Sequence, residues 1–145
     1  HLTGESIALS LPKENLLVID FDPDVINFLK KRGFNYIFGD VCEKEVFERA
    51  NFQESVLVIS TSPNLEDNLF LLAEIKKISS RPKIILRAET ETEAEILYKR
   101  GADYVLLPNF TAGQYLGKTI AINPAMEILG ELKRHDLSLL RKLEI

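Results

Sequence analysis

The sequence has 145 residues, a length typical of about one domain. Hydrophobic residues make up 46% and charged residues 28%, proportions that exclude a disordered tail, a collagen-like fibre and a disulfide scaffold. Lysine and arginine total 18 against 22 aspartate and glutamate, and the net charge is −4 with no basic stripe, so duplex nucleic acid is not an expected partner.

A short helix is expected first, from Thr3 to Leu11, and strand-length apolar runs follow it. The predicted strands are Leu16–Ile19, Tyr36–Phe38, Val56–Ser60, Ile84–Arg87 and Tyr104–Leu107. These runs are nearly continuous in apolar residues, which is typical of strands buried on both faces of a parallel sheet.

Helix signals stand between the strands. Asp22-Pro23 predicts an N-cap with proline in the first turn, and Gly33 predicts the end of that helix. Asp40 and Glu43 have capping-box spacing. The later start signals are Ser62-Pro63, Thr90 with Glu93, and Asn109, and Gly101 is the expected end of the helix that Thr90 opens.

The last two helical patterns are rich in apolar residues. The helix after Asn109 carries Ala112, Gly113 and Gly117, which either allow close approach of another helix or only weaken this one. Asn123-Pro124 begins a tail with leucines at helical spacing. We expect a Rossmann-like domain over residues 1–122, and a packing helix or connector over residues 123–145. So much apolar surface also predicts a homo-oligomer, dimer or higher, unless the tail folds back on its own sheet.

Alternating strands and helices predict an α/β fold, a parallel sheet with helices on both faces. Ligands in such sheets lie at the carboxyl ends of the strands. Asp20 follows the first predicted strand, where a carboxylate can either accept ribose hydroxyls or remain a solvated acid. Asp40 follows the second strand, after Gly39, and either lies by a flat ring of the ligand or only caps the next helix. Arg87 ends the fourth strand, where it can meet phosphate or pair with a nearby glutamate.

The spacing before Asp20 predicts a missing part of the sheet. Asp20 follows Gly4 by 16 residues, and in a G-x-G-x-x-G motif the acid falls about 20 residues after the first glycine. Gly4 therefore fits the third glycine. The first strand and most of the glycine-rich loop would then lie upstream of His1, and we expect the sheet of this chain to lack its first strand.

Several segments resemble one known family. They are L-L-V-I-D-F-D-P-D-V at 16–25, K-R-G-F-N-Y-I-F-G-D-V at 31–41, E-S-V-L-V-I-S at 54–60, E-D-N-L at 66–69, K-I-I-L-R-A at 83–88 and R-G-A-D-Y-V-L-L-P at 100–108. In this order, over about residues 3–121, they resemble the RCK (regulator of potassium conductance) family, also called KTN or TrkA-N domains. The resemblance implies a Rossmann-like, NAD-binding or related nucleotide-binding fold.

The resemblance also implies site residues. Asp20 would hold the adenosine ribose, Asp40 and Val41 would lie by the adenine, Arg87 would approach the phosphates, and Asn68 would lie near the ligand. Gly4 would belong to the phosphate-binding loop. Members of the family bind NAD(H), NADP, ATP, ADP or AMP, and we expect NAD(H) or another adenine nucleotide here. Cys42 stands where the family often has threonine or serine.

The function implied by the resemblance is that of a nucleotide-sensing, non-catalytic domain or subunit. It would regulate a potassium channel or transporter in the membrane, by population shift in an oligomer. The single cysteine fits a reducing compartment. No apolar run approaches the roughly 20 residues of a membrane span, and no leader opens the chain. We therefore expect a cytoplasmic domain, attached to the inner face of the membrane where a transporter holds it.

Two other functions stay open. A receiver domain has acids like Asp20 and Asp22 after its first strand, but its phospho-acceptor aspartate would stand where this chain has Ser60, Thr61 and Ser62. A fragment of an NAD-dependent oxidoreductase would need a general acid or base beside the nicotinamide, and both histidines lie near the chain ends. No metal-ligand cluster or Walker loop is recognised in the sequence, so we expect no catalysis and no bound metal.

Overall fold

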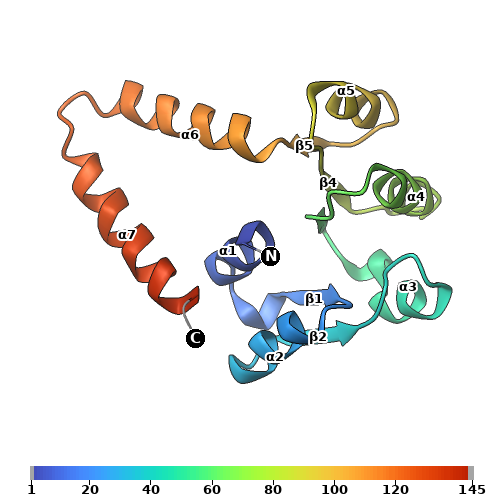
Figure 1. The fold of residues 1–145 in the computed structure, drawn as a ribbon. Helices are drawn as coiled ribbons and strands as arrows, with labels where there is room; N and C mark the ends of the chain where they lie inside the picture. The colour runs from blue at the N-terminus through green and yellow to red at the C-terminus, as the bar shows by residue number, and fades with distance from the viewer. Residues whose placement is uncertain (1, 144–145) are drawn as a thin grey trace.

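Strands and helices alternate along residues 2–143, the part of the chain that the computed structural model describes (Figure 1). The strands are β1 (Leu17–Asp20), β2 (Asn35–Phe38), β3 (Leu57–Ser60), β4 (Lys83–Arg87) and β5 (Tyr104–Leu106). The helices are α1 (Leu2–Ser10), α2 (Pro23–Lys31), α3 (Lys44–Ala50), α4 (Leu65–Lys76), α5 (Glu91–Lys99), α6 (Pro108–Ile122) and α7 (Ile128–Leu143), with 3-10 turns η1 (Lys13–Asn15) and η2 (Phe52–Glu54). All five predicted strands are confirmed to within one residue at each end.

The strands form two parallel sheets that do not pair with each other. One sheet has the order β1-β2, and the other has the order β3-β4-β5. The expected α/β class is confirmed. The division falls between β1 and β3.

Each sheet has its own core. The larger core lies around the three-stranded sheet and contains the side chains Leu71, Leu72, Ile75, Ile84, Leu86 and Leu97. The smaller core lies around β1, α1 and α2, with Ala8, Leu29 and Phe34 at its centre. The expectation of strands buried on both faces is wrong for the two-stranded sheet, since Leu17, Tyr36 and Phe38 are exposed there.

Four helix boundaries are as predicted. The Asp22 side chain accepts a hydrogen bond from Asp24 N–H at 2.9 Å and caps α2. The Thr90 hydroxyl accepts from Glu93 N–H at 3.2 Å and caps α5. Gly33 follows α2 with φ +72° and Gly101 follows α5 with φ +107°, a backbone conformation that favours glycine.

Three other predicted helix starts are wrong. Asp40 does not cap α3, because its carboxylate accepts from Cys42 N–H in the turn before the helix, and Glu43 is the N-cap without a side-chain bond. Asn64 caps α4 in place of Ser62-Pro63. Asn109 lies inside α6, because Pro108 occupies the first turn of that helix, a position for which its fixed φ is suited.

Helices α6 and α7 extend away from the sheets and turn back (Figure 1). Asn123-Pro124 ends α6, and the last helix begins only at Ile128. No atom of residues 2–143 lies within 4 Å of a Cβ built at Gly113 or Gly117, so these glycines make no close helix contact in that part of the chain. Neither helix has a buried residue.

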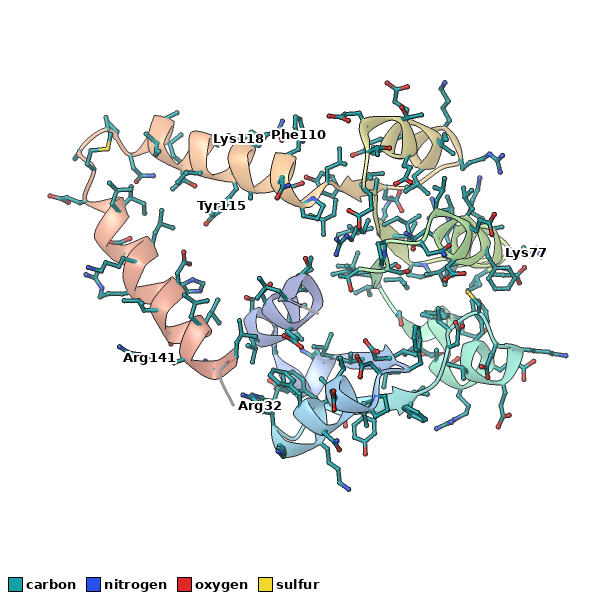
Figure 2. All side chains as sticks on the ribbon, in the orientation of Figure 1. Arg32, Lys77, Phe110, Tyr115, Lys118 and Arg141 are labelled. Carbon is teal, nitrogen blue, oxygen red and sulfur yellow. The ribbon has the colours of Figure 1, made fainter. Side chains whose placement is uncertain are left out.

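The α7 helix packs against α1. Its end is held by Arg32, whose guanidinium donates to the backbone oxygen of Lys142 and lies 3.9 Å from the centre of the Phe28 ring (Figure 2). Phe110 and Tyr115 on α6 are exposed. No helix within residues 2–143 is long and apolar enough to cross a membrane.

Candidate functional site

The carboxyl ends of the strands of both sheets lie on one side of the molecule. Cys42, just after β2, lies near enough to Asp40 and Asp67 for both carboxylates to raise the pKa of its thiol, and Asp67 lies in the first turn of α4, after β3. A Cβ built at Gly4 would lie 3.0 Å from the Thr61 hydroxyl oxygen, so the first turn of α1 meets the loop after β3. This edge carries every residue that the sequence predicts for the site.

Asp20 is the last residue of β1 and is partly buried. Its Oδ1 accepts a hydrogen bond from Asp22 N–H at 2.8 Å. Its backbone oxygen accepts from Gly39 N–H at 2.9 Å, which joins the ends of β1 and β2. The second carboxylate oxygen accepts no hydrogen bond from residues 2–143, so it is available to a hydroxyl donor.

Gly39 and Asp40 shape the turn after β2. A Cβ at Gly39 would lie 2.6 Å from a methyl carbon of Val46, so only glycine allows α3 to approach this closely. Asp40 Oδ1 accepts from Cys42 N–H at 2.8 Å, and Val41 packs against the larger core. Burial and the carboxylates of Asp67 and Asp40 raise the pKa of the Cys42 thiol to about 11, so the thiol is protonated and a poor nucleophile at neutral pH.

Asn68 is a buried connector between the end of β3, with the loop that follows it, and the end of β4. It is 1% exposed. Its Oδ1 accepts from the Ser60 hydroxyl at 2.6 Å, and its Nδ2 donates to the backbone oxygens of Ser62 and Arg87, each at 2.9 Å. Its side-chain amide therefore binds the ends of β3 and β4 together, and its action on a ligand would be indirect, through the segments that it positions.

Arg87 ends β4, and its side chain is 19% exposed. One guanidinium nitrogen lies 3.5 Å from the Thr61 backbone oxygen, and another pairs with Glu89 at 3.0 Å. The buried Nε has no partner within the described residues. The structure thus brings Arg87, Thr61 and Gly4 into one group, and the predicted pairing with a glutamate is present as well.

The predicted residues therefore fall into two groups. Asp20, Asp40 and Val41 belong to the edge of the two-stranded sheet, and Gly4, Asn68 and Arg87 lie at the loops that end β3 and β4. The sequence does not reveal Thr61 as the contact of α1, because no local pattern links residues so far apart in the chain.

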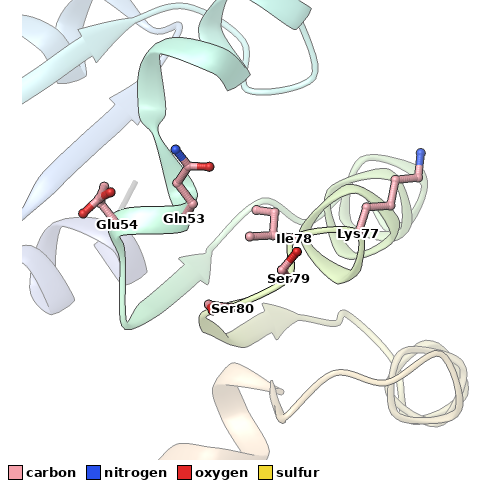
Figure 3. A pocket seen from close by; sticks show the side chains of 6 residues that line it. All are labelled: Gln53, Glu54, Lys77, Ile78, Ser79 and Ser80. Carbon is pink, nitrogen blue, oxygen red and sulfur yellow. The ribbon is translucent and has the colours of Figure 1, made fainter.

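Two surface hollows lie near these elements. The first, of about 490 Å³, adjoins the carboxyl ends of β1 and β2 and is lined by Phe21, Phe38, Gly39, Asp40, Glu43, Glu45, Val46 and Arg49. The second lies between η2 and the loop after α4, and Figure 3 shows its lining residues, Gln53, Glu54, Lys77, Ile78, Ser79 and Ser80. This second hollow is close to the amino end of β4, away from the candidate site.

The chemistry of the edge suits binding. Within residues 2–143, no group of three or more histidine, cysteine, aspartate or glutamate side chains is placed to hold a metal ion. A receiver domain would need an acceptor carboxylate after β3, but Ser60 occupies that place and donates to Asn68. The arrangement can accept hydroxyl hydrogen bonds at Asp20 and attract an anion at Arg87.

Comparison with known proteins identifies the family. A family model described as "TrkA-N domain" matches residues 2–108. Potassium channel protein 1 of Methanocaldococcus jannaschii is 27% identical over 125 residues, a match that covers 83% of this chain and 37% of that protein. The chain thus spans little more than a third of the length of this relative.

Solved structures share the fold. The TrkA-N domain of the inner membrane protein YbaL from Escherichia coli matches with a TM-score of 0.65 and 21% identity, over 82% of this chain and 86% of that chain. The Kef CTD of Shewanella denitrificans, solved in an AMP-bound form, matches with a TM-score of 0.52 and 19% identity, over 88% of this chain and 96% of that one. The expected Rossmann-like class and the family resemblance are both confirmed.

Proposed function

This chain belongs to the TrkA-N domain family, and we propose that it is a regulatory domain that senses an adenine nucleotide. The nucleotide binds at the carboxyl edge of the strands, and its binding changes the activity of a potassium channel or transporter. The proposed partner rests on the name of the archaeal relative, a potassium channel protein.

One observation carries the proposal. Asp20 ends β1 with one carboxylate oxygen bound to Asp22 N–H and the other without a partner in residues 2–143. A carboxylate at this position of a dinucleotide-binding fold accepts hydrogen bonds from ribose hydroxyls. The similar Kef domain was solved with AMP, which supports the nucleotide as ligand class.

The remaining predicted residues have distinct roles in this proposal. Asp40 and Val41 border the adenine. The Arg87 guanidinium attracts the phosphates, and the first turn of α1 at Gly4 lies beside the same loop. Asn68 positions the segments on which Arg87 and Ser62 lie.

The ligand is NAD(H), ATP, ADP or AMP in preference to NADP. A 2′-phosphate would place its negative charge against Asp20, and the next residues, Phe21 and Asp22, supply no cation to accept it. In this proposal the nucleotide is a signal and is not consumed.

Binding produces its effect by population shift. A nucleotide that binds one arrangement of paired domains more tightly favours that arrangement. We propose that two or more copies assemble through the exposed apolar residues of α6 and α7, with residues 1–122 as the nucleotide domain and residues 123–145 as the connector. The domain would lie on the cytoplasmic side, next to the membrane part that it regulates.

The test is the affinity for nucleotide of an Asp20→Ala variant, measured by calorimetry with AMP, ADP, ATP and NAD(H). We expect the substitution to weaken binding by about 1–3 kcal/mol, the scale of hydrogen bonds to a charged group. Asp24→Ala is the matched control, since Asp24 is an exposed acid in the first turn of α2. Equal affinity of the Asp20→Ala and parent proteins for every nucleotide would refute the ribose assignment.

A further inference from the structure

Arg87 is a cation of the candidate site that already binds a carboxylate. Its Nη2 lies 3.0 Å from Oε1 of Glu89, two residues further along the chain. A guanidinium binds a carboxylate and a phosphate through the same N–H donors. Glu89 therefore occupies a donor group that the proposed function assigns to the phosphates of the nucleotide.

The other donors of Arg87 are poorly satisfied in this arrangement. Nη1 lies 3.5 Å from the Thr61 backbone oxygen, which is beyond the usual length of a hydrogen bond. Nε is buried and has no partner within residues 2–143. The pair with Glu89 thus leaves Arg87 incompletely bonded. A phosphate group, with several acceptor oxygens in one tetrahedron, can accept from more of these donors than a single carboxylate oxygen does.

The Glu89 side chain can leave Arg87 while the backbone around it stays in place. This side chain is 42% exposed, so solvent can receive it. The Glu89 N–H donates to the Glu93 carboxylate at 2.7 Å, and the Thr90 hydroxyl accepts from the Glu93 N–H at the start of α5. Neither bond involves the Glu89 carboxylate. Because a partly exposed ion pair contributes little to stability, a phosphate can displace this carboxylate at a small cost.

A phosphate and the Glu89 carboxylate do not share Arg87 readily. If both bound at once, two anions would lie on one guanidinium, and the repulsion between them would weaken the contact of each. The Arg87 side chain is 19% exposed, so water screens this repulsion less than it would at an open surface. Binding of a phosphate at Arg87 therefore favours release of Glu89 into solvent.

We propose that Glu89 is an internal competitor for the phosphate of the nucleotide. Its carboxylate binds Arg87 in the ligand-free domain and is displaced to solvent when a phosphate binds there. The inference rests on the proposed nucleotide binding and adds a residue that sets its strength. Glu89 weakens the binding of ligands that carry a phosphate, and it leaves the hydrogen bonds between Asp20 and the ribose unchanged.

Calorimetry with AMP and ADP tests the competition in the parent protein, Glu89→Gln and Glu91→Gln. Glutamine retains the size of the glutamate side chain and removes its charge. We expect Glu89→Gln to bind both nucleotides about two- to fivefold more tightly, the factor that corresponds to a partly exposed ion pair. Glu91→Gln is the matched control, because Glu91 is exposed in the first turn of α5 and its replacement removes the same charge without removing a partner of Arg87. We expect its affinity to stay within twofold of the parent value.

Thermal unfolding separates competition from a structural role of Glu89. The ligand-free Glu89→Gln protein loses an ion pair, so it should be no more stable than the parent, although it binds nucleotide more tightly. A residue that only holds Arg87 in its binding position would lower both stability and affinity when it is replaced. An Arg87→Gln background completes the cycle, because Glu89→Gln should no longer tighten binding once Arg87 is absent.

Each other outcome contradicts the proposal. Unchanged or weaker binding in Glu89→Gln would show that Glu89 does not compete, while binding by the parent would leave the nucleotide function in place. An equal gain in Glu91→Gln would show that both glutamates act only through their general charge. A gain that persists in the Arg87→Gln background would place the effect of Glu89 elsewhere. Absence of binding in the parent and in every variant would refute the nucleotide function itself, and the competition with it.

Discussion

Replacing Asn68 with alanine tests the most buried polar group at the candidate site. The amide makes three hydrogen bonds, to the Ser60 hydroxyl and to the backbone oxygens of Ser62 and Arg87. Alanine removes all three and leaves the two carbonyls without their donor. Because Asn68 is 1% exposed, solvent cannot readily replace it.

The magnitude follows from those bonds. A net hydrogen bond contributes about 1 kcal/mol, and a buried polar group left without a partner costs about 1–3 kcal/mol. Partial relaxation of the loops reduces the sum, so we expect Asn68→Ala to lower the free energy of unfolding by about 2–4 kcal/mol. Asn68→Asp should cost at least as much, because a carboxylate cannot donate to the two carbonyls.

Urea unfolding followed by circular dichroism measures this loss. With a slope of roughly 1–3 kcal/mol per molar urea, the midpoint should fall by about 1–2 M. Asn109→Ala is the control, since Asn109 is exposed on α6 and its substitution should change stability by less than about 0.5 kcal/mol. A loss in Asn68→Ala no larger than that of the control would refute the reading of Asn68 as a connector of the strand ends.

Two further predictions concern other contacts. Gly4→Ala should destabilise the protein by about 1 kcal/mol relative to Gly113→Ala. The new Cβ at residue 4 would lie 3.0 Å from the Thr61 hydroxyl oxygen, whereas a Cβ at Gly113 would have no atom within 4 Å. Equal thermal stability of the two variants would contradict the contact between Gly4 and Thr61. The hydrogen bond from Ile84 N–H, and then Arg81, lowers the pKa of Asp103, so its stabilisation is fully present above the unfolded value near 3.9 and is lost as pH falls through the lower folded value. Asp103→Asn should therefore lose less stability than the parent protein between pH 6 and pH 2, by about 0.5–1 kcal/mol, since the ion pairs are partly exposed. Unfolding curves in which the two proteins lose stability in parallel would contradict this.

The sequence predicts the alternating elements because each strand is a short apolar run and several helix ends are marked by particular residues. Asp22 and Thr90 cap helix starts with their side chains, and Gly33 and Gly101 adopt a positive φ just after helix ends. The errors at Asp40 and Asn109 have different causes. The Asp40 carboxylate closes the turn before α3, whereas Asn109 lies inside α6 because Pro108 already occupies the first turn of that helix.

The site is harder to predict than the fold. Asp20 and Asp40 can be recognised as candidate site residues because each lies at the end of a predicted strand. The role of Asn68 is not, because its partners Ser62 and Arg87 belong to separate loops and a sequence pattern cannot show that an amide is buried between them. The division into two sheets is anticipated only through the spacing from Gly4 to Asp20.

The two sheets make the proposed nucleotide site depend on their relative position. Asp20 and Asp40 lie on one sheet, and Asn68 and Arg87 lie on the other. A ligand that contacts both groups must hold the sheets in one relative position, and the approach of Gly4 to Thr61 already favours such a position. Any contact that fixes this position before the ligand arrives lowers the ordering cost of binding. By linkage, the ligand must then stabilise that relative position by the same free energy by which the fixed position strengthens ligand binding.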